Sequence, residues 1–132
     1  MIESVFKLIK KYRMRRIKQY MILEKDSVYG TNFFVEVRKP QKEVYLTIGH
    51  HCLIDGRFIF EKESGSISIG NNVHIGNNTK LISVNEIIVE DEVIISWGCM
   101  IYDHNSHSVY TDERKNDVEQ EYRAYRSIYE TA

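Results

Sequence analysis

Aliphatic residues recur every six positions through the middle of the chain, in three separate runs. Gly, Asp, Glu or Ser follows the aliphatic residue in six of the eight units, and a small or short residue lies four positions after it in five. The aliphatic positions are Ile48 and Ile54, then Ile69, Ile75 and Leu81, then Val89, Ile95 and Ile101. A fixed six-residue repeat is typical of a chain wound as a parallel β-helix.

Each unit predicts one flat face and one corner of a triangular coil. The aliphatic side chain points inward, and Gly or Asn takes the corner, where these residues adopt a positive φ most easily. The larger repeat is 21 residues from Ile48 to Ile69 and 20 from Ile69 to Val89, so we expect corner loops near 62–65 and 83–86. The pattern therefore predicts an all-β fold, with a hexapeptide-repeat β-helix of three coils over 48–103.

An ordinary antiparallel sheet is the alternative, because a period of two residues also contains a period of six. The antiparallel sheet is disfavoured because a polar residue or glycine directly follows most of the aliphatics, at a position where a strand should continue. We therefore favour the β-helix.

The segment 1–25 is predicted to form a basic amphipathic helix. It carries eight Lys or Arg against two Glu, a net charge of +6, which leaves −7 on the other 107 residues of a chain at −1. Such a helix either packs on the body of the protein, which we favour, or lies on an anionic membrane surface. Nucleic-acid binding is not supported, because no base-stacking motif accompanies the basic residues.

Two other segments lack the repeat. Residues 26–47 read as short lead-in strands, with the only proline, Pro40, at the turn between them. Residues 104–132 read as a polar, catalytic-type loop followed by a short C-terminal helix. Tyr122, Tyr125 and Tyr129 lie three and four apart in this helix, and we expect their stripe to pack against another subunit.

Composition and cysteine placement indicate a cytoplasmic protein. No apolar run is long enough to span a membrane, and the charged N-terminus does not read as a secretory signal. Cys52 and Cys99 both fall on the small interior position of a hexad, so we interpret them as buried thiols rather than a disulfide.

The histidines direct attention to the place where the repeat stops. His104 and His107 lie in the polar loop, and loops on a rigid scaffold commonly carry reactive groups. A neutral histidine acts as a general base when one ring nitrogen is free and the other is held. Adjacent side chains on an extended segment point to opposite faces, so we expect a backbone carbonyl, rather than Asp103, to hold His104. His50, His51 and His74 are expected to face solvent.

Residues 46–117 resemble the hexapeptide-repeat acyltransferases, and most of all the galactoside and maltose O-acetyltransferase group. The resemblance rests on the Ile-Gly hexads, on Ile-Ser-Trp-Gly-Cys-Met-Ile-Tyr-Asp-His-Asn-Ser-His-Ser over 95–108, and on Glu-Arg-Lys-Asn-Asp over 113–117. It implies a left-handed β-helix and a homotrimer with active sites between subunits. The implied reaction is acetyl transfer from acetyl-CoA to a hydroxyl of a sugar or polysaccharide precursor.

Motif alignment with this family assigns individual roles. His104 falls on the catalytic histidine, and His107 would shape the acceptor pocket. Trp97 would line the sugar site or serve in packing, and Asn78 is a candidate donor to the oxyanion. The alignment assigns no residue to coenzyme A and none to a metal.

The chain departs from the family in one respect. Family members continue after this loop with further coils, along which the pantetheine arm of coenzyme A runs, whereas this sequence stops at Ala132. Two alternatives therefore stay open. One is a non-catalytic, oligomerising remnant, and the other is a metal hydratase like the γ-class carbonic anhydrases, with His104, His107 and His74 of a neighbouring copy as ligands.

Overall fold

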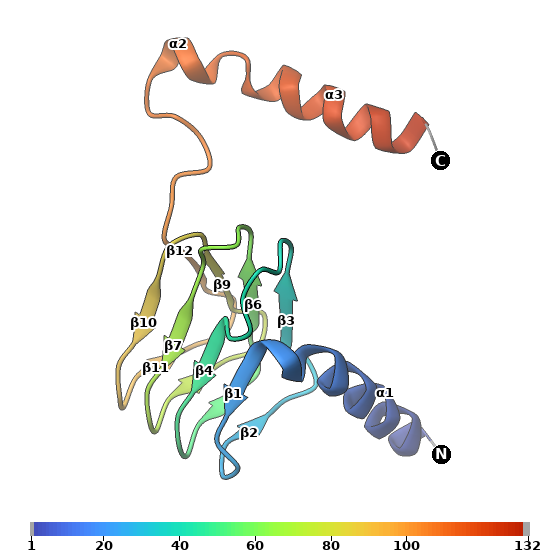
Figure 1. Cartoon of the computed structure of the whole chain (residues 1–132), viewed down its shortest axis with the longest axis vertical. Helices are drawn as coiled ribbons and strands as arrows, with labels where there is room; N and C mark the ends of the chain where they lie inside the picture. The colour runs from blue at the N-terminus through green and yellow to red at the C-terminus, as the bar shows by residue number, and fades with distance from the viewer. Residues whose placement is uncertain (1, 131–132) are drawn as a thin grey trace.

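The chain winds as a left-handed parallel β-helix of four coils, with a helix at each end (Figure 1). The structure is a computed structural model that describes residues 2–130. Met1 and residues 131–132, the ends of the two predicted terminal segments, lie outside the described residues. Three flat sheets of four parallel strands form the faces of the prism, in the orders β1-β4-β7-β10, β2-β5-β8-β11 and β3-β6-β9-β12, called here the first, second and third sheets.

Each coil contributes one strand to each sheet. The chain begins with α1 (Ile2–Ile17) and a short 3₁₀ turn (Lys18–Tyr20), and it ends with α2 (Thr111–Arg114) and α3 (Asp117–Glu130). The strands are β1 (Met21–Leu23), β2 (Val28–Tyr29) and β3 (Phe34–Val37); β4 (Leu46–Ile48), β5 (Leu53–Ile54) and β6 (Arg57–Phe60); β7 (Ile67–Ile69), β8 (His74–Ile75) and β9 (Lys80–Ser83); β10 (Ile87–Val89), β11 (Ile94–Ile95) and β12 (Met100–Tyr102).

Six of the eight aliphatics of the repeat are buried in the core, as predicted, whereas Ile95 and Ile101 of the fourth coil are only half-buried against it. In the first sheet, Ile48 aligns with Ile69 and Ile69 with Val89, and all three side chains are buried. In the second, Ile54 aligns with Ile75, and both are fully buried. Identical positions of successive coils therefore stack, and each aliphatic side chain packs on its counterpart one coil away.

The predicted lead-in segment forms a coil of its own. Strands β1, β2 and β3 pair in parallel with β4, β5 and β6, so the β-helix has four coils rather than three and begins at Met21. The predicted boundaries at 25 and 47 therefore fall inside this coil and at the start of the next. The first coil was missed because it carries no Ile-Gly unit, although Phe33 and Val35 fill its interior.

Pro40 lies in the connection between β3 and β4, as expected. The buried ring of Tyr45 anchors this connection, because its hydroxyl oxygen accepts the backbone N–H of Gln41 at 2.9 Å. The thiol of Cys52 is buried, as predicted, while that of Cys99 in the fourth coil is only half-buried.

The corners use glycine and asparagine for different reasons. Asn72 and Asn78 adopt φ of 56° and 59°, the positive values expected at a corner. The glycines of the Ile-Gly units do not, and that part of the prediction was wrong. A Cβ on Gly70 would lie 2.9 Å from the backbone nitrogen of Asp91 in the next coil, and one on Gly76 would lie 2.8 Å from that of Trp97. These glycines allow the backbones of neighbouring coils to approach closely.

The two terminal helices differ in their relation to the β-helix. The C-terminal half of α1 packs against the first coil, where Ile17 is buried beside Phe33 and Met14. In contrast, α2 and α3 project away from the fourth coil (Figure 1), and the tyrosine stripe of α3 is exposed. None of the helices within residues 2–130 has the length and apolar character needed to cross a bilayer.

Candidate functional site

Asp103 is the first residue after the last strand, and it is fixed to the coil below. Its carboxylate accepts hydrogen bonds from the Ser83 hydroxyl at 2.6 Å and from the backbone N–H groups of Val84 and Asn85, each at 2.8 Å. Burial of the carboxyl raises its pKa, but these bonds and the contact with His104 outweigh burial and lower the pKa of Asp103 to about 2. The side chain is therefore an anion at neutral pH.

His104 lies between two carboxylates. Its Nδ1 atom is 3.1 Å from Oδ1 of Asp103, and its Nε2 atom is 3.2 Å from Oε2 of Glu61. The side chain is 14% exposed, and Nε2 is buried and makes no hydrogen bond, because the nearby Glu61 carboxylate is not oriented to form one. The expectation that a backbone carbonyl would hold the ring was wrong. The chain bends at residues 103 and 104, so the alternation of side chains in an extended strand ends at Tyr102.

The charge state of Asp103 determines which nitrogen of His104 carries the hydrogen. An ionised carboxylate only accepts hydrogen bonds, so Nδ1 must be the donor in this contact. A neutral His104 ring then has its lone pair on Nε2. The ring of Tyr102 packs edge-on against the imidazole, with centroids 5.7 Å apart, and closes one side of the site.

Glu61 is a site residue that the sequence did not reveal. It follows β6, two coils below His104, and its Oε1 atom also accepts a hydrogen bond from Arg38 at 3.4 Å. The strand register relates these positions, since β6 pairs with β9 and β9 with β12. The residue numbers alone do not reveal that Glu61 and His104 lie at equivalent corners, because the loops between coils differ in length. Once the strand register is known, Glu61 can be identified by comparing the residues that follow the third-sheet strands in successive coils.

His107 is separate from this cluster. Its Nδ1 atom lies 2.8 Å from Oδ2 of Asp117, the first residue of α3, and the side chain is 46% exposed. No hydrogen bond joins it to His104 among the described residues. The Asp117 contact connects the polar loop to the start of α3.

Trp97 and Asn78 lie at the other end of the third sheet. Asn78 precedes β9 and Trp97 precedes β12, whereas His104 follows β12. These strands, of four and three residues, separate the two ends by roughly 10–13 Å at ~3.3 Å per residue. A groove of about 460 Å³ is lined there by Trp97, Asn78, His74, Leu53 and Ile94, among others. Trp97 is 79% exposed, so it serves no packing role within the chain. One chain therefore brings Trp97 and Asn78 together but places neither beside His104.

The remaining histidines face solvent, as predicted. His50 lies 3.1 Å from Oδ1 of Asp26, and His51 takes a positive φ at a corner. His74 is exposed and lines the same groove as Trp97. His104, His107 and His74 thus lie in three different places, and residues 2–130 contain no group of three or more His, Cys, Asp or Glu side chains suited to hold a metal ion.

The chain was compared with protein-family models, with curated proteins and with solved structures. None of the three comparisons found a match.

Proposed function

We propose that the protein transfers an acetyl group from acetyl-CoA to a hydroxyl group of a sugar or polysaccharide precursor, with His104 as the general base. The observation that carries the proposal is the Asp103–His104 pair. An ionised carboxylate holds Nδ1, and the buried Nε2 atom lacks a hydrogen bond. This is the arrangement that activates a hydroxyl nucleophile in acyl transfer.

The reaction assigned to this site begins with proton transfer. Nε2 of His104 takes the proton of the acceptor hydroxyl while the hydroxyl oxygen attacks the thioester carbonyl carbon. The tetrahedral intermediate collapses as the carbon–sulfur bond breaks, and the imidazolium returns its proton to the leaving thiolate. The products are the O-acetyl ester and free coenzyme A, with no net change in protonation of the protein.

Asp103 and Glu61 are positioning residues in this proposal. Asp103 holds the ring and fixes the tautomer with hydrogen on Nδ1. The Glu61 carboxylate lies 3.2 Å from Nε2, where it would stabilise the positive charge that His104 acquires during the reaction. No hydroxyl oxygen fits between two atoms that are 3.2 Å apart, so the Glu61 carboxylate must turn aside before an acceptor hydroxyl can reach Nε2. Glu61 would therefore also limit which hydroxyls reach the base.

The site would be completed by a neighbouring copy of the chain. Trp97 and Asn78 flank an exposed groove at the opposite end of the third sheet from His104. In a threefold assembly of parallel prisms, that end of one copy can face the His104 end of the next. This separation supports a homotrimer in which one subunit supplies the base and its neighbour supplies the sugar-binding surface and the oxyanion donor.

The proposal is tested by measuring acetyl transfer directly. Purified protein is incubated with acetyl-CoA and a panel of mono- and oligosaccharides, and products are identified by mass spectrometry, because Cys52 and Cys99 would interfere with a thiol reagent. We expect a mono-acetylated sugar with at least one acceptor. Failure of every acceptor in the panel, with the β-helix folded, would contradict the proposal.

A further inference from the structure

The N-terminal half of α1 exposes a continuous apolar face. The side chains of Ile2, Val5, Phe6, Leu8, Ile9 and Tyr12 are between 45% and 75% exposed. At 100° per residue they fall within one arc of roughly 160°. An apolar surface of this kind marks a contact with a partner rather than with water.

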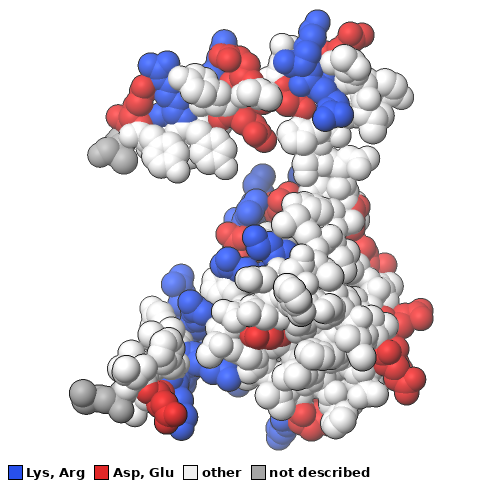
Figure 2. Space-filling view, turned by 180° about the vertical axis from the view of Figure 1, so that it is seen from behind, with Lys and Arg blue, Asp and Glu red and all other residues white. Residues whose placement is uncertain are grey.

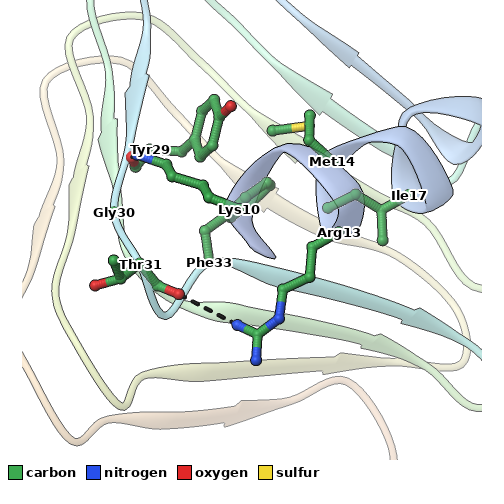
Figure 3. A pocket seen from close by; sticks show the side chains of 8 residues that line it. All are labelled: Lys10, Arg13, Met14, Ile17, Tyr29, Gly30, Thr31 and Phe33. Atoms are coloured by element: carbon green, nitrogen blue, oxygen red, sulfur yellow. Dashed lines mark hydrogen bonds between the residues drawn. The ribbon is translucent and has the colours of Figure 1, made fainter. Parts of the chain in front are cut away.

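The surface of α1 has three different faces, of which the apolar arc is the first. The second face packs on the first coil (Figure 3): Nζ of Lys10 donates to the carbonyl oxygen of Tyr29 at 2.8 Å, and Arg13 donates to that of Thr31 at 3.3 Å. Met14 and Ile17 cover Phe33 on the same side. The third face carries Lys7, Lys11 and Arg15, all exposed. Up to Tyr12, the apolar arc is therefore distinct from the basic face and adjoins the packing face. The exposed Arg13 and Arg16 lie at the C-terminal end of the arc.

The charge of α1 argues for an anionic partner. The helix carries six Lys or Arg against Glu3 alone, a net charge of +5. In Figure 2, α1 projects from the body at the lower left, and its uncharged residues, drawn white, lie beside blue Lys and Arg side chains and a smaller red acidic area. Two copies of this helix would repel one another, which disfavours pairing of α1 with α1.

A net negative charge lies at the other end of the molecule, because residues 87–103 of the fourth coil carry four acidic side chains and no Lys or Arg. Glu90, Asp91 and Glu92 are exposed at the corner between β10 and β11 in the fourth coil, whereas α1 packs on the first coil (Figure 1). An anionic surface would attract the α1 end and repel the fourth coil. The charge distribution thus complements the apolar face and sets one orientation.

We propose that α1 docks on an anionic lipid surface, with its apolar arc among the acyl chains and its Lys and Arg side chains at the headgroups. The helix would lie in the plane of the interface, as basic amphipathic helices do. The packing of Lys10, Arg13 and Ile17 on the first coil would hold the β-helix directly above that surface.

Vesicle flotation of the 132-residue chain tests this proposal. We expect binding to equimolar phosphatidylcholine and phosphatidylglycerol vesicles, no binding to phosphatidylcholine alone, and weaker binding at high salt. Phe6→Ser/Ile9→Ser and Lys7→Glu/Lys11→Glu should each weaken binding by about tenfold or more, since both apolar burial and charge contribute.

Matched variants at exposed positions elsewhere serve as controls. Ile88→Ser/Val118→Ser removes apolar side chains, and Lys39→Glu/Lys115→Glu makes the same charge change outside α1. Control variants should bind as the parent does, and all variants should keep its circular dichroism spectrum. Absence of binding to anionic vesicles would overturn the proposal. So would equal loss in the controls, or sedimentation showing that Phe6→Ser/Ile9→Ser dissociates an oligomer without changing vesicle binding.

Discussion

Asp103 joins the scaffold to the candidate base. The same carboxylate that accepts hydrogen bonds from Ser83, Val84 and Asn85 of the third coil also holds Nδ1 of His104. The position of His104 is therefore set by the corner of the coil below it rather than by the polar loop that follows.

The lowered pKa of Asp103 predicts how this residue contributes to stability. Its pKa is about 2 in the folded protein and near 3.8 when unfolded, so its contribution is fully present above about pH 4 and is lost as the pH falls toward 2. The shift corresponds to about 2 kcal/mol at most. We expect the difference in unfolding free energy between the parent protein and Asp103→Asn to shrink by about that amount between pH 6 and pH 2, as measured by urea unfolding.

Other carboxylates titrate over the same range, so the difference between the two proteins is the quantity to follow. Asp112→Asn is a useful comparison, because the Asp112 side chain is exposed at the surface in the first turn of α2. A difference between the parent protein and Asp103→Asn that stays constant with pH would show that Asp103 is not held as described.

At the level of the strands, inward-facing aliphatics determine stability. Ile75 and Ile94 are the same residue type on paired strands, β8 and β11, but Ile75 is fully buried and Ile94 is 77% exposed. Ile75→Ala should lower the free energy of unfolding by about 2–5 kcal/mol, because it removes buried methyl groups and leaves a cavity. Ile94→Ala should change it by less than about 1 kcal/mol. Urea unfolding of both variants checks this, and equal losses would contradict the inward and outward assignment.

The repeat predicted these strands well because each hexad encodes its own burial pattern. In the unit Ile69-Gly70, the isoleucine indicates a side chain that points inward, and the glycine indicates that the backbone of the next coil passes close by. The first coil was harder to predict, because Phe33 and Val35 fill the same interior without such a unit. The presence of Glu61 in the candidate site was harder still to predict. Its approach to His104 depends on the lengths of two inter-coil loops, which the sequence of either segment alone does not specify.

At the scale of the whole molecule, a single chain separates the predicted site residues. His104 lies after β12, while Trp97 and Asn78 lie before β12 and β9. If a neighbouring copy completes the site, two different inactive variants should restore activity when they assemble together.

His104→Ala and Trp97→Ala/Asn78→Ala proteins are each expected to lose most of their transfer activity. Unfolded together and refolded as a mixture, they should recover part of it, because some interfaces then combine an intact base with an intact groove. The matched control mixes His104→Ala with Asp103→Ala, two changes on the same side of the interface, and should recover none. A Trp97 mixture that stays inactive, although mass spectrometry shows mixed oligomers, would contradict a shared site.

The central claim is that His104 is the general base, and the rate of acetyl transfer by His104→Ala tests it most directly. With the acceptor found in the sugar panel, the account predicts a fall in kcat of about 10²–10⁴-fold, the usual contribution of a positioned base. The circular dichroism spectrum and unfolding midpoint should remain close to those of the parent protein. His51→Ala, which removes an exposed corner histidine, should keep full activity. A folded His104→Ala protein with undiminished kcat would contradict the account.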